Sequence, residues 1–209
     1  PFPAEDGIRD AASCLVGSEM CIRDRVTLMQ MDEGMDTGPL LAKATTPIEP
    51  GDDAGTLSER LSRMGAELLT EELPRYVAGA LRTEPQDETE ATMAPLLRKE
   101  DGRIDWAQSA EAVHDQIRGM NPWPGAHTSL GKRRIKIHRA VPSTLDPEGA
   151  KPGEVTALDP EGILVACSRG TLEIQELQES GRKRVDARSF ISGRRVAVGD
   201  RFSHEEAAS

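Results

Sequence analysis

The order of apolar and polar positions predicts two strands followed by a helix in the first half of the chain. The runs VTLMQM (26–31) and LLAKATTPI (40–48) are strand-like, and the second alternates in part between apolar and polar side chains. Between residues 56 and 73, leucine and methionine recur at spacings of three and four. This spacing places them on one stripe of an amphipathic helix.

The ends of this helix carry their own signals. Thr56 and Glu59 form a capping-box pattern at its start. Pro74 is expected to end or kink the helix, and Gly79 marks the limit of any continuation. The polar, acidic and proline-containing run from 82 to 95 has little to bury, so we interpret it as an interdomain linker.

Beyond the linker, the pattern predicts a small β-rich domain. Residues 109–120 predict a short helix with Ser109 as its N-cap and with Val113, Ile117 and Met120 facing inward. Strands are predicted at 134–141, 154–158, 163–167, 171–177 and 194–198, and a brief helix at 186–192. Five short strands separated by turn residues favour a small closed or half-closed barrel, for which an OB-like fold is one natural candidate.

The first 25 residues, PFPAEDGIRDAASCLVGSEMCIRDR, follow neither helical nor strand periodicity. The pieces AEDGIRD and LVGSEMCIRDR resemble translations of sequencing-library adapter DNA. A targeting peptide would need an apolar run or an acid-poor amphipathic stretch, and this segment has neither. We therefore expect residues 1–25 to be a non-native segment and leave them out of the fold argument.

Composition and cysteine usage favour a globular protein of a reducing compartment. The chain has 37% hydrophobic and 3% aromatic residues, so its core must be mainly aliphatic, and no run approaches the roughly 20 apolar residues of a membrane helix. Cys14 and Cys21 lie in the excluded segment, which leaves Cys167 in the apolar run ILVAC as a structural thiol. Cys167 has no metal-ligand companions at a useful spacing, so we expect no metal site and a cytoplasmic location.

Charge is unevenly distributed. Residues 26–120 hold 9 Lys and Arg against 19 Asp and Glu, whereas residues 121–209 hold 14 against 12. Three basic runs, at 131–139, 181–188 and 193–201, lie beside glycine turns. Each could be a solvated loop, but three in one small β-rich segment make a polyanion-binding face a reasonable hypothesis.

Three motifs then give the chain a family resemblance. MDEGMDTG (31–38), KEDGRIDW (99–106) and NPWP (121–124) occur in the order and at the spacing seen in methionyl-tRNA formyltransferases. The resemblance runs from Val26 to about Phe202. It implies a fragment of a Rossmann-like α/β formyltransferase domain at 26–81, the linker at 82–95, and an OB-like β-barrel domain at 96–209 that helps to bind tRNA.

The resemblance also implies a reaction. The family transfers a formyl group from 10-formyltetrahydrofolate to the amino group of methionine on initiator tRNA, and it uses an Asn, a His and an Asp. Asp36 matches this catalytic Asp, whereas Asp32 is better interpreted as a turn residue. Without the family, Asp36 itself would be interpreted as a turn residue whose carboxylate caps backbone amides. The expected tRNA-binding residues are Lys99, Lys132, Arg133, Arg134, Lys136, Arg182, Lys183, Arg184, Arg194 and Arg195.

The catalytic partners of Asp36 are not in this sequence. The family's Asn and His, and its Ser-Leu-Leu-Pro folate-binding motif, lie upstream of the position matched by Val26. None of the four histidines, His114, His127, His138 and His204, is a plausible replacement. We therefore expect the chain as written to be catalytically inactive, and the parent protein to be a monomer that binds neither membrane nor DNA.

Two alternatives stay open at this point. Residues 96–209 could act as a stand-alone RNA-binding module, or the parent could formylate another amine, such as that of a sugar nucleotide. The two tryptophans, Trp106 and Trp123, are expected to be packing anchors at the base of the barrel.

Overall fold

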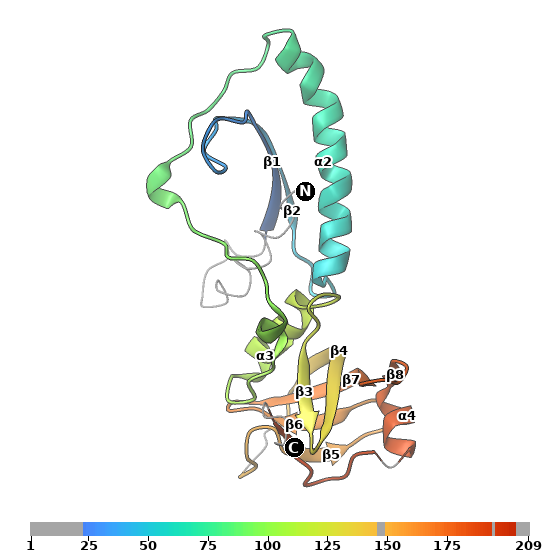
Figure 1. Cartoon of the computed structure of the whole chain (residues 1–209). Helices are drawn as coiled ribbons and strands as arrows, with labels where there is room; N and C mark the ends of the chain where they lie inside the picture. Colours follow the sequence, from blue (N-terminus) through green and yellow to red (C-terminus); the bar gives the residue numbers. More distant parts are fainter. Residues whose placement is uncertain (1–22, 146–148, 194, 204–209) are drawn as a thin grey trace. The chain divides into compact units, whose positions relative to one another are not determined.

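The computed structural model describes residues 23–145, 149–193 and 195–203, and the chain divides into two compact units between Leu96 and Leu97 (Figure 1). Most of the segment interpreted as adapter-derived, including Cys14 and Cys21, lies outside the described residues. Arg194 and His204 also lie outside them.

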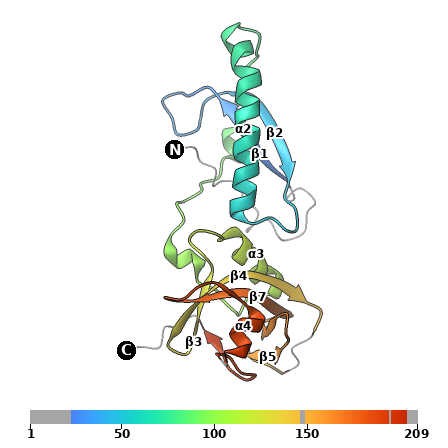
Figure 2. The same ribbon diagram turned by 90° about the vertical axis from the view of Figure 1, so that its right-hand side faces the viewer.

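The first unit is a strand pair covered by one long helix. Strands β1 (Arg23–Met29) and β2 (Leu40–Pro47) pair antiparallel, and helix α2 (Ala54–Val77) lies along them (Figure 2). Gly65 allows the close approach, because a Cβ built there would lie 3.3 Å from a methyl carbon of Val26. Both strands and the helix were predicted, and β1 begins three residues earlier than expected.

The helix begins earlier and ends later than predicted. Its N-cap is Asp53 rather than Thr56, since the Asp53 carboxylate accepts from the Thr56 amide at 2.8 Å and the Thr56 hydroxyl accepts from the Asp53 amide at 2.9 Å. Pro74 lies within the helix instead of ending it, three residues before Val77. Gly79, with a φ of 69°, follows the end of the helix as expected.

A half-buried ion pair joins the turn after β2 to the first half of α2. Two nitrogens of the Arg60 guanidinium donate to the two carboxylate oxygens of Asp52 at 3.0 and 2.5 Å, and one of them also donates to the Pro47 carbonyl at 2.8 Å. The hydrogen bond from Arg60 is the main reason that the pKa of Asp52 lies below its ordinary value.

This pair predicts a pH dependence for the first unit. Because the pKa of Asp52 is lowered in the folded state, its contribution is present above 3.8, the ordinary value, and is lost as the pH falls through the lowered pKa. In Asp52→Asn we expect faster amide hydrogen exchange over residues 47–61 at pH 7, with a difference from the unchanged chain that vanishes at low pH. Asp53→Asn is the matched control, because asparagine also caps helices well. An equal effect of both changes at pH 7 would contradict the prediction.

The second unit is an antiparallel sheet that curls into a barrel. Its strands are β3 (His127–Leu130), β4 (Arg133–Ser143), β5 (Val155–Leu158), β6 (Ile163–Ala166), β7 (Thr171–Glu179), β8 (Val185–Asp186) and β9 (Phe202–Ser203). The strand order is β5-β6-β7-β4-β3-β9, with β8 paired to β7. Hydrogen bonds from the Val155 amide to the Asp200 carbonyl and from the Phe202 amide to the Gly153 carbonyl, both 2.8 Å, link the two ends of this order. The predicted fold class, a formyltransferase-type α/β fragment followed by an OB-like barrel, is confirmed.

The barrel is completed by the 3-10 turn η3 (Lys99–Gly102) and the α-helices α3 (Ala110–Gly119) and α4 (Ala187–Ser192). A further 3-10 turn, η2 (Glu88–Glu90), belongs to the first unit. Ser109 caps α3 as predicted, and Val113 and Ile117 are buried in the aliphatic core between α3 and the sheet. None of the helices in the described ranges is both long and apolar enough to cross a bilayer.

Two sequence predictions about the second unit are wrong. The strand expected at 194–198 does not form in its described part, residues 195–198, where the Ala197 amide instead donates to the Asp200 carboxylate in a turn. The edge of the sheet is formed by β9, which was not predicted. Trp106 is a packing anchor, 3% exposed with its ring 5.7 Å from that of Phe202, but Trp123 is 52% exposed. Trp123 lies in a turn in which both X–Pro bonds are cis.

Candidate functional site

The loop between β1 and β2 carries the first candidate site. The Gln30 amide donates to the Pro39 carbonyl at 2.9 Å and closes the loop at its base. Inside it, the Asp32 carboxylate accepts from the Gly34 amide at 3.0 Å and from the Thr37 hydroxyl at 2.7 Å. Asp32 is therefore the turn residue that the sequence indicated.

Asp36 lies in the same loop but plays no such part. It is exposed, and its carboxylate accepts no hydrogen bond from the residues that the structure describes. Its φ of 56° is the only positive value outside glycine in the described ranges. A left-handed conformation costs an ordinary residue about 1–2 kcal/mol, less for aspartate. The loop thus holds Asp36 in an uncommon backbone conformation and leaves its carboxylate available.

The two glycines of the motif are required by close approach. A Cβ at Gly34 would lie 2.0 Å from the Thr37 hydroxyl oxygen, and a Cβ at Gly38 would lie 1.7 Å from the Gln30 carbonyl oxygen. Any side chain at either position would displace a neighbour that holds the loop. The spacing Asp-x-Gly-x-Asp-Thr-Gly therefore encodes the geometry of this loop.

Gln86 contacts this loop and was missed by the sequence analysis. Its side-chain Nε2 donates to the carbonyls of Asp36 and Gly38, each at 2.7 Å. Two residues before it, Glu84 exchanges backbone hydrogen bonds with Leu40 at 2.7 and 2.9 Å. The start of the segment expected as a linker is thus bonded to the first unit. No periodicity or composition signal marks Gln86, because its partners are about 50 residues away in sequence.

The second candidate site is the basic region of the barrel, which we define as Lys132, Arg133, Arg134, Lys136, Arg182, Lys183, Arg184 and Arg195. Arg133 and Arg182 approach the same carboxylate oxygen of Glu179, at 3.8 and 3.6 Å. Arg133 also donates to the carbonyl of Arg195. The start of β4, the turn after β7 and the segment at 195 therefore meet, so residues from all three basic runs lie together.

Acidic side chains offset part of this charge. Glu179 lies between two arginines, and Glu176 accepts from the Nε of Arg184 at 2.7 Å and lies 3.8 Å from Arg139. Lys132 and Lys183 are exposed and form no ion pair within the described residues. The guanidinium of Arg195 lies 5.6 Å from the ring centroid of Phe190, a cation–π geometry.

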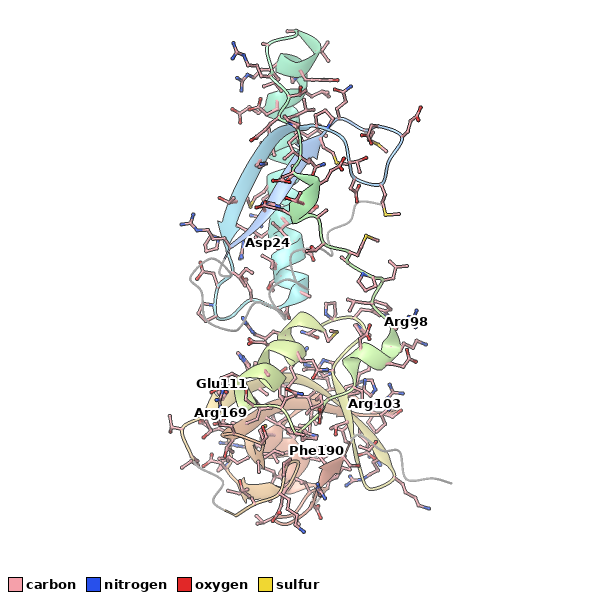
Figure 3. The ribbon with its side chains drawn as sticks, turned by 90° about the vertical axis from the view of Figure 1, so that its left-hand side faces the viewer. Asp24, Arg98, Arg103, Glu111, Arg169 and Phe190 are labelled. Carbon is pink, nitrogen blue, oxygen red and sulfur yellow. The ribbon has the colours of Figure 1, made fainter. Side chains whose placement is uncertain are left out.

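Lys99 belongs to a different element from the basic region. It is the first residue of η3, which Arg98 and Arg103 flank (Figure 3). The Arg98 amide donates to the Asp101 carboxylate at 2.7 Å, and Gln116 of α3 donates to the carbonyls of Asp101 and Arg103 at 3.0 and 2.9 Å. Lys99 is exposed at the start of this anchored turn.

The cysteine and three of the histidines of the barrel have pKa values shifted by burial. Burial raises the pKa of the Cys167 thiol to about 12, so this cysteine is a core residue and not a nucleophile. Burial likewise lowers the pKa values of His114, His127 and His138. Within the described ranges, no three His, Cys, Asp or Glu side chains are grouped closely enough to hold a metal ion.

The family descriptions that match this chain fit both units. Residues 23–73 match the description "Formyl transferase", and residues 96–195 match "Formyl transferase, C-terminal domain". The chain belongs to the formyl transferase family.

Curated relatives narrow this class. Methionyl-tRNA formyltransferase of Geobacter metallireducens is 42% identical over 191 residues, which are 91% of this chain and 60% of that protein. The protein of the same name from Trichlorobacter lovleyi is 46% identical over 186 residues, or 89% of this chain and 57% of its own length. The chain is a methionyl-tRNA formyltransferase homologue, and it spans about 60% of the length of these relatives.

Solved structures share the fold at lower identity. HypX from Aquifex aeolicus, in complex with tetrahydrofolic acid, is 20% identical with a TM-score of 0.67, over 93% of this chain and 33% of HypX. An N-formyltransferase from Helicobacter canadensis, with folinic acid and dTDP-3-aminofucose, is 18% identical with a TM-score of 0.59, over 81% of this chain and 59% of that one. At these identities, the likeness establishes the fold alone.

Proposed function

We propose that the protein to which this chain belongs transfers a formyl group from 10-formyltetrahydrofolate to the amino group of methionine on initiator tRNA, in the cytoplasm. The observation that carries the proposal is the Asp36 loop, in which Asp32 and two glycines build the turn and the Asp36 carboxylate is left available. It lies in a chain that is 42–46% identical to methionyl-tRNA formyltransferases.

The reaction gives Asp36 a defined task. An amine attacks the formyl carbonyl, a tetrahedral oxyanion forms, and a proton must leave the attacking nitrogen while another reaches the leaving nitrogen. A carboxylate next to a histidine stabilises the charged imidazole and keeps it oriented for these transfers. We assign this role to Asp36, with the histidine, the oxyanion-binding Asn and the main folate-binding motif supplied by upstream sequence.

The basic region supplies a surface for the other substrate. Phosphate groups attract clustered Lys and Arg, and this attraction depends on the local cluster rather than on the net charge of the chain. The convergence of the three basic runs through Glu179 and Arg195 is the specific observation in favour of tRNA as the acceptor. A sugar-nucleotide acceptor would not require such a surface.

The test begins with the gene. Long-read resequencing across the codon for Val26 should reveal an open frame that continues upstream into an Asn-x-His and a Ser-Leu-Leu-Pro sequence. Activity is measured on a hybrid protein, in which the upstream part of the Geobacter metallireducens relative precedes residues 26–209 of this chain. The hybrid should formylate methionyl-tRNA, whereas the chain as written should not. A folded hybrid that formylates only a sugar-nucleotide amine, or neither acceptor, would contradict the proposal.

RNA binding by the chain as written can be tested separately. Neutralising the two exposed lysines, in Lys132→Gln with Lys183→Gln, should weaken tRNA binding and reduce the slope of log K against log salt by about 1–2, since each lost phosphate contact removes about 0.9. The matched control, Lys151→Gln with Arg63→Gln, removes the same charge outside the basic region. Binding that does not depend on salt, or equal losses in both double variants, would count against the basic region. If tRNA affinity falls steeply with added salt while the hybrid is inactive, the result would favour a stand-alone RNA-binding module.

A further inference from the structure

The side-chain amide of Gln86 is placed to control the Asp36 loop. Its Nε2 lies 2.7 Å from the Asp36 carbonyl oxygen and 2.7 Å from the Gly38 carbonyl oxygen. Both neighbours are acceptors only, and an amide nitrogen carries two N–H donors, so the nitrogen rather than the oxygen must face them. One side chain thus satisfies two carbonyls on either side of Thr37.

These bonds fix the backbone that aims the Asp36 carboxylate. The carbonyl of Asp36 and its φ of 56° belong to one residue, and a non-glycine residue keeps a left-handed conformation only where its surroundings hold it. The hydrogen bond from the Thr37 hydroxyl to the Asp32 carboxylate spans Asp36, and Gln86 holds the carbonyls of Asp36 and Gly38. Since no described residue bonds to the Asp36 carboxylate itself, its direction depends on this backbone.

The position of Gln86 is in turn fixed by its own segment. The reciprocal backbone bonds between Glu84 and Leu40 place the segment beside the start of β2, and the Glu84 carboxylate lies 3.7 Å from the Lys43 ammonium. These contacts set Gln86 in register with Gly38, two residues before Leu40. We call the two hydrogen bonds from Gln86 to the carbonyls of Asp36 and Gly38 the Gln86 clamp. The Gln86 clamp continues the backbone pairing of Glu84 with Leu40 and is not an isolated surface contact.

We propose that Gln86 is a positioning residue for the formyl transfer reaction, which orients the Asp36 carboxylate by holding the carbonyls of Asp36 and Gly38. The proposal rests on the proposed function in so far as Asp36 is the reacting carboxylate. It assigns a role in the N-terminal site to a residue of the polar segment that precedes the barrel.

The first test needs no activity. In the chain as written, Gln86→Glu keeps the size of the side chain but replaces both donors by an oxygen that faces two carbonyls. Amide hydrogen exchange over residues 32–38 should become about 10- to 100-fold faster, because one exposed and one half-buried hydrogen bond that hold the loop are lost. Gln116→Glu is the matched control, because Gln116 bridges two carbonyls in the second unit in the same way. It should accelerate exchange at 101–103 and leave 32–38 unchanged. Unchanged exchange at 32–38 in Gln86→Glu would overturn the proposal.

The second test separates positioning from a general loss of structure. In the hybrid, Gln86→Glu should lower kcat about 10- to 100-fold with little change in the KM for methionyl-tRNA or in the thermal midpoint. In a hybrid that already carries Asp36→Asn, adding Gln86→Glu should lower kcat much less than Gln86→Glu does alone, because no Asp36 carboxylate is left to misplace. Fully additive losses, or a rise in KM alone, would contradict the positioning role. An inactive unchanged hybrid would defeat the proposed function, while the exchange test would still decide whether Gln86 holds the loop.

Discussion

Asp36→Asn in the hybrid protein is expected to lower kcat for formyl transfer by about 10²- to 10⁴-fold, the usual contribution of a group that takes part in proton transfer. Folding should be almost unaffected, since the Asp36 carboxylate is exposed and accepts no hydrogen bond from the described residues. The measurement is steady-state formylation of methionyl-tRNA with a thermal melt of each variant.

Asp32→Asn provides the matched control four residues earlier in the same loop. Asparagine keeps an oxygen that can accept from the Gly34 amide and the Thr37 hydroxyl, so the turn should persist and kcat should fall by less than about tenfold. Equal losses in the two variants would show that the charge of the loop as a whole matters and would remove the special role assigned to Asp36.

Trp106→Ala is expected to destabilise the barrel by about 3–5 kcal/mol, the usual cost of removing a large buried aromatic side chain. The ring of Trp106 is packed against Phe202, and its Nε1 donates to the Thr128 hydroxyl at 3.0 Å, which in turn donates to the Ser203 carbonyl at 2.8 Å. The loss of this side chain would therefore open a cavity beside Phe202 and remove the donor to the Thr128 hydroxyl, which bonds to β9. Urea unfolding of the full chain, followed through the remaining tryptophan, measures the effect.

Trp123→Ala makes the same chemical change at a half-exposed position and should cost less than about 1 kcal/mol. If Trp106→Ala does not fold, Trp106→Phe keeps most of the packing and loses the hydrogen bond to Thr128, with an expected cost of about 1–2 kcal/mol. Similar costs for Trp106→Ala and Trp123→Ala would contradict the placement of the two side chains.

Local signals explain why parts of the fold were predictable. The helix α3 has its cap, Ser109, and its buried positions, Val113 and Ile117, within nine residues, so the sequence alone indicated it. Strand β3, by contrast, reads HTSL and is mostly polar, yet all four residues are buried because neighbouring strands cover them and supply hydrogen bonds. Strand β9 has two residues and exists only through its pairing with β3.

The candidate site also combines residues marked by local sequence signals with residues placed only by long-range contacts. Asp36 was predicted as a catalytic residue only through the family resemblance of its contiguous motif, and the roles of Gly34 and Gly38 are readable once the loop is known. Gln86 was not predicted, since its contacts join positions about 50 residues apart in sequence. The basic runs were visible singly, but their convergence depends on the register of β4 with β7, which pairs Ile135 with Glu179.

The attachment of Gln86 and Glu84 to the β1–β2 strand pair bears on how members of this family can be recombined. A chimera joined at residue 82, where the composition changes, would combine the Asp36 loop of one protein with the Gln86 clamp of another. A crossover between Gln86 and Leu97 would keep loop and clamp from the same parent. Chimeras joined between Gln86 and Leu97 should therefore retain the turnover of the protein that supplies the loop. Evolution by exchange of C-terminal domains would be constrained to junctions in the same segment.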